Sequence, residues 1–164
     1  MGVPFVYPLF LVLLVGLTIF GVARAAMPGR TRGAWIAIAA WFVATLFMTV
    51  RDGSGEGVRL NLIPFVVDGP GSALDAVRNF FVFVPLGILL AVIGWRLLVV
   101  LGTALAVSLA IEITQYVTDR GRIADVNDLI TNVAGAALGW LVVWAIHRAA
   151  VNHRARRSSA PETS

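Results

Sequence analysis

The stretch LLVVLGTALAVSLAIEITQYVT, residues 97–118, decides how the chain folds. Its single charged residue is Glu112, and the rest is almost entirely apolar. A helix of about 20 apolar residues crosses the roughly 30 Å hydrocarbon core of a bilayer. The stretch is therefore predicted to be a transmembrane helix that carries one carboxylate into the membrane.

Four further apolar stretches flank this segment, at residues 4–23, 33–50, 79–94 and 129–147. Each is long enough, or nearly long enough, to cross a bilayer as a helix. We expect the first to be a retained helix and not a cleaved signal peptide, because no basic residue precedes it. The fold class predicted is an all-α, polytopic membrane helix bundle with about five transmembrane helices in one domain, residues 1–150.

The composition supports a membrane protein and argues against a soluble cytosolic enzyme. Apolar residues make up 59% of the 164 residues and charged residues 13%, against about 45–50% and about 25% in ordinary globular domains. The absence of cysteine excludes a disulfide framework, a thiolate zinc site and a cysteine nucleophile. All 13 basic residues are arginines, mostly between the apolar stretches, which indicates membrane topology and not nucleic-acid binding.

The segments outside the spans lead to three further expectations. Within the long connection 51–78, residues 60–67 are too short to cross and too apolar to float freely, which favours an interfacial or re-entrant segment. Pro85 is expected to kink the third span, and neighbouring helices must then cover the carbonyl that it frees. Residues 151–164 are predicted to be a disordered cytoplasmic tail.

The arginines in the connections predict the orientation of the chain. With the N-terminus outside, eight arginines lie on the inner side and five on the outer side. Because arginine-rich connections stay in the cytoplasm, we expect the N-terminus outside and the C-terminus in the cytoplasm of a bacterial plasma membrane.

Two polar stripes run along the last two spans. Ser108, Glu112 and Gln115 share one face of the fourth helix by their spacing. That face must avoid lipid, either because it forms a ligand site or because Glu112 pairs with an arginine and locks two helices.

On the fifth helix, Asp128, Asn132, Gly135 and Gly139 repeat the same spacing. The two glycines predict close helix packing, with Asn132 at the same seam, or alternatively the seam of a homo-oligomer. Either Asp125 or Asp128 is expected to cap the fifth helix.

Polar residues from four parts of the chain are predicted to gather at the outer leaflet as a ligand-binding site. Arginine side chains suit phosphate or carboxylate groups, and amides suit sugars or peptide groups. We expect neither a metal nor a cofactor. The candidates are Arg59, Asn61, Arg78, Asn79, Glu112, Gln115, Arg122, Asp125, Asp128 and Asn132.

These residues resemble the motifs of the VanZ-like membrane family over about residues 42–144. The matching pieces are RLNLIPF at 59–65, RN at 78–79 with FVPLG at 83–87, Ser108 with EITQ at 112–115, and RIADVND at 122–128 with Asn132, Gly135 and Gly139. The resemblance implies a small envelope protein, whose founding member is associated with reduced susceptibility to the glycopeptide teicoplanin.

Three functions remain open at this point. The first is binding of a lipid-linked cell-wall precursor, another amphiphilic envelope ligand or a glycopeptide. Membrane lipids are expected to surround the protein, and nucleic acid is not an expected partner. The second is an intramembrane enzyme that acts on a polyprenyl-phosphate-linked precursor, with Glu112 and Asp128 as acid and base. The third is a structural or partner-binding subunit.

Overall fold

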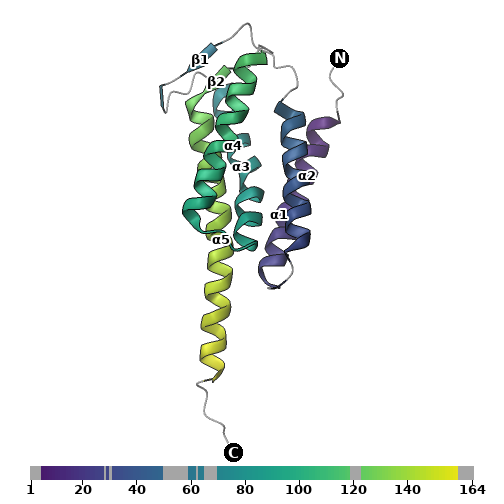
Figure 1. Cartoon of the computed structure of the whole chain (residues 1–164), viewed down its shortest axis with the longest axis vertical. Helices are drawn as coiled ribbons and strands as arrows, with labels where there is room; N and C mark the ends of the chain where they lie inside the picture. The colour runs from purple at the N-terminus through teal and green to yellow at the C-terminus, as the bar shows by residue number, and fades with distance from the viewer. Residues whose placement is uncertain are drawn as a thin grey trace, which may run out of the picture.

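The chain forms a bundle of helices with a small sheet at one end (Figure 1). The structure is a computed structural model, and it describes residues 5–27, 29, 31–49, 59–61, 63–64, 70–118 and 123–158. In chain order the elements are α1 (Val6–Ala25), α2 (Arg32–Thr49), β1 (Arg59–Asn61), α3 (Pro70–Val92), α4 (Leu97–Thr118), β2 (Ile123–Asp125) and α5 (Val126–Ser158).

All five of these helices are long and apolar enough to cross a membrane. The predicted all-α, multi-pass membrane bundle is therefore confirmed. α1 begins and α5 ends at opposite ends of the bundle (Figure 1), as an odd number of crossings requires. The two strands add a minor element that the sequence did not predict, three residues each and paired in parallel.

Two helices are longer than predicted. α3 begins at Pro70, whereas the apolar pattern put its start at residue 79, because the first turns of this helix are polar and do not register as a span. Proline is well suited to a first helical turn. α5 continues to Ser158, so the expectation of a disordered tail is wrong for residues 151–158, where alanine and arginine favour helix. Residues 159–164 lie outside the described part of the chain.

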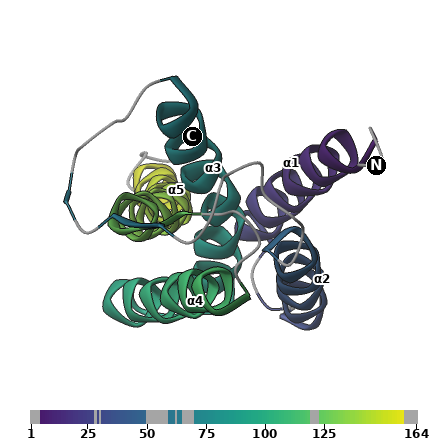
Figure 2. The ribbon, with the colours of Figure 1, turned by 90° about the horizontal axis from the view of Figure 1, so that it is seen from above.

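α3 runs through the middle of the bundle, with the other helices around it (Figure 2). Trp41 of α2 packs edge-on against Phe83, with ring centroids 5.2 Å apart. The Trp41 indole N–H also donates a hydrogen bond to the carbonyl of Val82, 2.7 Å away. Pro85 leaves the carbonyl of Phe81 without its helical donor, whereas the bond from Trp41 goes to the next carbonyl, that of Val82. The helix itself continues through Pro85.

Glycines set the close approach of α3 and α5. A Cβ atom at Gly135 would overlap the carbonyl oxygen of Phe80, and one at Gly139 would overlap that of Val84. From the other side, a Cβ at Gly87 would overlap the backbone of Ala136. The predicted role of Gly135 and Gly139 in helix packing is confirmed. Their face is covered by α3 of the same chain, and the alternative of a homo-oligomer through these two glycines stays a prediction.

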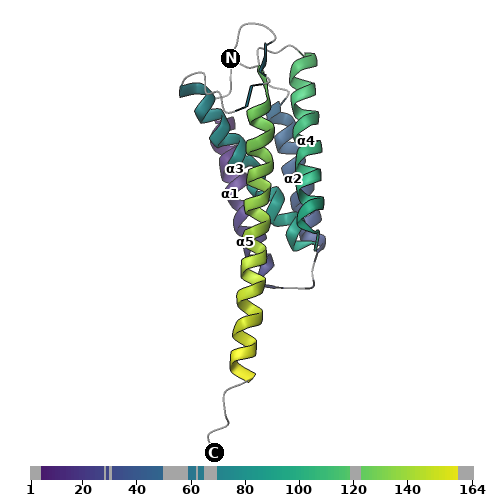
Figure 3. The same cartoon turned by 90° about the vertical axis from the view of Figure 1, so that its left-hand side faces the viewer.

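α5 extends well beyond the other helices (Figure 3). From Val126 to Trp144 it rises about 27 Å, close to the thickness of a hydrocarbon core. Trp144 is about half exposed, and the guanidinium of Arg148 lies 5.9 Å from the centre of its ring. Since tryptophan and arginine collect at membrane boundaries, we expect the rest of α5 to project from the bilayer.

The contact between α3 and α5 predicts the effect of adding a methyl group at Gly135. Gly135→Ala must push two backbones apart, and we expect it to lower the free energy of unfolding by about 1–3 kcal/mol. Thermal unfolding of the protein in detergent micelles measures this change.

Gly102→Ala is the matched control, because a Cβ at this α4 glycine meets nothing within 4 Å. It is expected to be neutral or to stabilise by about 0.5–1 kcal/mol, since alanine is the better helix former. Equal destabilisation by both variants would contradict the close packing at Gly135.

Candidate functional site

Glu112 is held by the backbone at the start of α5. Its carboxylate Oε2 accepts a hydrogen bond from the N–H of Asp125 at 3.0 Å, and only 6% of its surface is exposed. A carboxylate in a spanning helix needs such a partner, because an unpaired charge at this depth is costly. One partner of Glu112 is thus a backbone amide at the start of α5. The interpretation that Glu112 also pairs with an arginine stays a prediction.

This bond fixes the depth of the small sheet. Glu112 lies six residues before Thr118, the end of α4, so α4 rises about 9 Å past it. Asp125 is the last residue of β2, and its register partner in β1 is Asn61. The ends of both strands therefore reach down beside α4 to the level of Glu112, below the end of that helix.

The start of α5 is capped by Asp125. Its Oδ1 accepts hydrogen bonds from the backbone N–H of Asn127 at 2.8 Å and from the Asn127 side chain at 2.9 Å, the pattern of an N-cap. Of the two predicted capping candidates, Asp125 has this role. Asp128 lies in the first turn of α5 and is half-buried. The side-chain amide of Asn127 also donates to the carbonyl of Ile63 at 3.5 Å, which links α5 to the chain after β1.

Asn132 and Ser108 join α5 to α4 inside the bundle. The Asn132 amide donates to Ser108 Oγ at 2.8 Å, and the two residues are 3% and 0% exposed. The Asn132 Oδ1 atom is buried and has no hydrogen-bond partner among the residues that the structure describes. Asn132 was expected at the seam of Gly135 and Gly139. That expectation is wrong, because those glycines face α3 and the Asn132 amide bonds to α4.

The structure describes the other predicted site residues to different extents. Gln115 is buried on the same face of α4 as Glu112. The β1–β2 pairing brings Arg59 and Asn61 alongside residues 123–125, as the hypothesis of a shared site requires, although only the backbone of these two residues is described. Arg122 lies outside the described residues.

Arg78 and Asn79 do not begin α3, as we had expected. Both lie more than two turns inside it, because the helix starts at Pro70. Arg78 is exposed and forms an ion pair with Asp75, 2.9 Å away, one turn earlier on the same helix. Asn79 is half-buried.

Two buried threonines on α2 were missed by the sequence reasoning. Thr45 and Thr49 are 7% and 5% exposed. Within the described part of the chain, Thr45 Oγ1 is buried without a hydrogen-bond partner. They continue the spacing of the buried residues Ala37 and Trp41, a signal that the sequence contained. With Ser108, Glu112, Gln115 and Asn132 they are the buried polar side chains of the described chain.

The buried polar residues share one half of the bundle, the half nearer the sheet. Thr49 ends α2, Gln115 lies in the last turn of α4, and Asn132 lies in the second turn of α5. The other half contains apolar core residues such as Leu89 and Val100. The interior is therefore polar toward the sheet and apolar toward the opposite end, and the sheet end contains every described candidate site residue.

Comparison with family models now identifies the group to which the chain belongs. The VanZ/LLP1 family model matches residues 34–147 of the 164. The chain belongs to the VanZ/LLP1 family. The match runs from the first turns of α2 into α5 and so extends beyond the region 42–144 that the motifs had indicated.

The match also divides this VanZ/LLP1 protein into two parts. The sheet end with Glu112, Asp125 and Asn132 lies within the matched region, whereas α1 and the end of α5 beyond residue 147 lie outside it. Comparisons with curated proteins and with solved structures each gave no match.

The Asn132–Ser108 bond predicts a coupled pair. Ser108→Ala leaves a buried amide unpaired, which typically costs about 1–3 kcal/mol. In the double variant with Asn132→Leu, the loss of unfolding free energy is expected to be smaller than the sum of the two single losses. The difference should be about 0.6–1.7 kcal/mol, the range of side-chain hydrogen bonds in membrane proteins. Unfolding of the four proteins in bicelles measures the coupling.

Thr114→Val provides the control partner in this cycle. The Thr114 hydroxyl bonds to the carbonyl of Ala110 in its own helix. The change in unfolding free energy caused by Thr114→Val should therefore simply add to the change caused by Asn132→Leu, without coupling. Additivity between Ser108 and Asn132 as well would contradict the hydrogen bond.

Proposed function

We propose that this VanZ/LLP1 protein binds the polar head of an amphiphilic cell-envelope molecule at its sheet end. The proposal assigns the protein to a bacterial plasma membrane, with the sheet end and the N-terminus outside and the C-terminus in the cytoplasm. The ligand is a lipid-linked wall precursor, with a polyprenyl phosphate as its anchor. Binding of this precursor would lower susceptibility to teicoplanin-type glycopeptides.

The observation that carries the proposal is the bond between Glu112 and the Asp125 N–H. It brings polar backbone and side chains about two turns below the end of α4. An amphiphile in the outer leaflet has its polar head near this level and its chains beside the helices. Irregular backbone at membrane depth is tolerated where protein covers it or water reaches it, so this region suits a polar head.

The unpaired groups of the polar half suit a ligand that brings hydrogen-bond donors. Asn132 Oδ1 and Thr45 Oγ1 are buried without partners in the described ranges of the chain, and a buried polar atom is costly until it is satisfied. A sugar or peptide head carries hydroxyl and amide donors, whereas a hydrocarbon carries none. In the proposal, Arg59 and Arg122 hold the phosphate, with Asn61, Asn79, Gln115 and Asp128 nearby, and Arg78 contributes at the rim.

Binding is favoured over the acid–base alternative by the state of Glu112. Its Oε2 is engaged by a backbone amide, which suits a group that organises a site more than one that exchanges protons with a substrate. Asp128, the second residue of the alternative, lies in the helix turn that follows the cap. We therefore assign Glu112 the role of holding the sheet and the start of α5 in place.

The test is binding of a polyprenyl-phosphate-linked precursor to the purified protein in nanodiscs. Glu112→Gln keeps the shape of the side chain but weakens its bond to the Asp125 N–H, because a neutral acceptor is weaker than a charged one. We expect affinity to fall about tenfold, in line with the loss of one charge-assisted hydrogen bond.

Thr118→Val is the control, since the Thr118 hydroxyl bonds only within α4 at the same end of the helix. It should leave binding unchanged. Equal affinity in wild type and Glu112→Gln, or no binding in either, would contradict the proposal, and turnover of a labelled precursor would favour the enzyme instead. When expressed in a teicoplanin-susceptible bacterium, the Glu112→Gln variant should lower susceptibility to teicoplanin less than the wild-type protein does.

A further inference from the structure

We propose a second binding site, for the phosphate group of an anionic lipid, at the end of the bundle opposite the sheet. The site is the hollow between the last turns of α1 and the first turn of α2. It has a volume of about 500 Å³ and is lined by Phe20, Arg24, Gly29, Thr31, Arg32 and Gly33. This volume lies within the range of small-molecule sites, and the proposal does not depend on the function assigned to the sheet end.

Two arginines give the hollow its charge. Arg24 comes from the last turn of α1, and Arg32 is the first residue of α2. Residues 24–33 contain three arginines and no acidic residue, so the positive charge is not offset within this segment. Guanidinium groups bind phosphate through two parallel hydrogen bonds, and two of them from different helices can hold one phosphate from two sides.

The start of α2 adds a weaker positive charge to the hollow. The Thr31 carbonyl accepts hydrogen bonds from the N–H groups of Ala34 and Trp35. The N–H groups of Arg32 and Gly33 belong to the turn whose amides have no partner within a helix. They carry the positive end of the helix dipole, which complements the charge of the two arginines.

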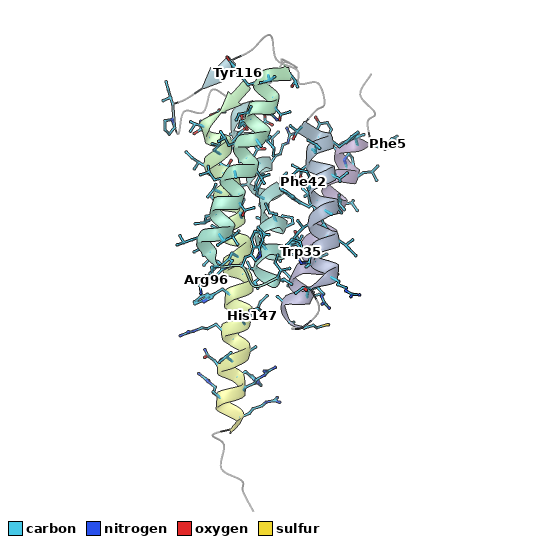
Figure 4. All side chains as sticks on the ribbon, viewed as in Figure 1. Phe5, Trp35, Phe42, Arg96, Tyr116 and His147 are labelled. Atoms are coloured by element: carbon cyan, nitrogen blue, oxygen red, sulfur yellow. The ribbon has the colours of Figure 1, made fainter. Side chains whose placement is uncertain are left out.

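Aromatic residues place the hollow at the level of lipid headgroups. Trp35 lies one turn after Arg32 and packs edge-on against Trp95, with ring centroids 6.2 Å apart. The indole N–H of Trp140 donates to the carbonyl of Trp95 at 2.9 Å. Figure 4 shows Trp35, Arg96 and His147 toward this end of the bundle, away from Tyr116. Tryptophans and arginines gathered at one level mark a membrane boundary.

The surroundings favour a lipid over a soluble phosphate. Phe20 forms an apolar wall, and a Cβ at Gly33 would stand 3.0 Å from its ring, so glycine lets that ring pack against the start of α2. Ile19 and Ile36 on the same two helices are 64% and 72% exposed. Acyl chains attached to a phosphate in the hollow would meet these apolar surfaces, which a free phosphate cannot use.

The experiment measures the affinity of the purified protein for single lipids by native mass spectrometry. The probes are phosphatidylglycerol, phosphatidylcholine and inorganic phosphate. We expect phosphatidylglycerol to bind about tenfold more tightly than phosphatidylcholine, because the choline cation offsets the phosphate charge. Inorganic phosphate should bind more weakly than either lipid. The double variant Arg24→Gln/Arg32→Gln should lose this preference.

Two further variants keep the result interpretable. Arg24→Lys/Arg32→Lys preserves the charge and the topology signal but not the paired hydrogen bonds, and it should lose part of the preference. Arg154→Gln/Arg157→Gln removes the same charge from the exposed end of α5. It should change the preference for phosphatidylglycerol over phosphatidylcholine by less than about twofold, as expected for exposed charges.

Several outcomes would overturn the site. Equal affinity of the wild-type protein for the two lipids would do so. An equal loss of preference in the Arg154/Arg157 variant and in the Arg24/Arg32 variant would also do so, because it would indicate general attraction of anions. Inorganic phosphate binding as tightly as phosphatidylglycerol would overturn the assignment to a lipid. Glu112→Gln should leave the preference unchanged, so failure here is distinguishable from failure at the sheet end.

Discussion

A carboxylate inside a spanning helix must be satisfied within the protein, and this requirement organises the sheet end of the molecule. Glu112 meets it with the backbone N–H of Asp125. Because Asp125 is at once the last residue of β2 and the cap of α5, one bond places a strand and a helix start. The bond also requires α5 to begin below the end of α4, so that polar backbone reaches below the helix ends.

The packing of α3 against α5 supports this arrangement from the other side. Gly87, Gly135 and Gly139 let the two backbones approach more closely than any side chain would allow, which fixes α5 along the central helix. Asn132 then joins the same helix to α4 through Ser108. α5 is thus fixed by close packing on one face and by a buried hydrogen bond on another.

The sequence was sufficient for the features that depend on residue type and local spacing. The bounds of α4 match the prediction because charged residues follow its apolar stretch directly. The stripe of Ser108, Glu112 and Gln115 is buried as its spacing indicated. The bond from the Asp125 N–H to Glu112 was beyond prediction, since a backbone amide carries no sequence signal.

Errors arose where tertiary structure decides the outcome. The polar first turns of α3 are helical although no apolar pattern marks them, and this moved Arg78 from a helix start to an exposed ion pair with Asp75. Thr45 and Thr49 were passed over although they continue the helical spacing of Ala37 and Trp41. The choice of α3 as the partner of Gly135 and Gly139 depends on the folded chain.

The proposed function requires the polar half of the bundle to face the outside of the membrane. Because the chain has no cysteine, single cysteines report this directly in intact cells with a membrane-impermeant thiol reagent. Thr118→Cys tests the sheet end, and Ala149→Cys tests the projecting part of α5, both at exposed positions. We predict labelling at 118 and not at 149, and labelling at 149 with none at 118 would contradict the proposed orientation.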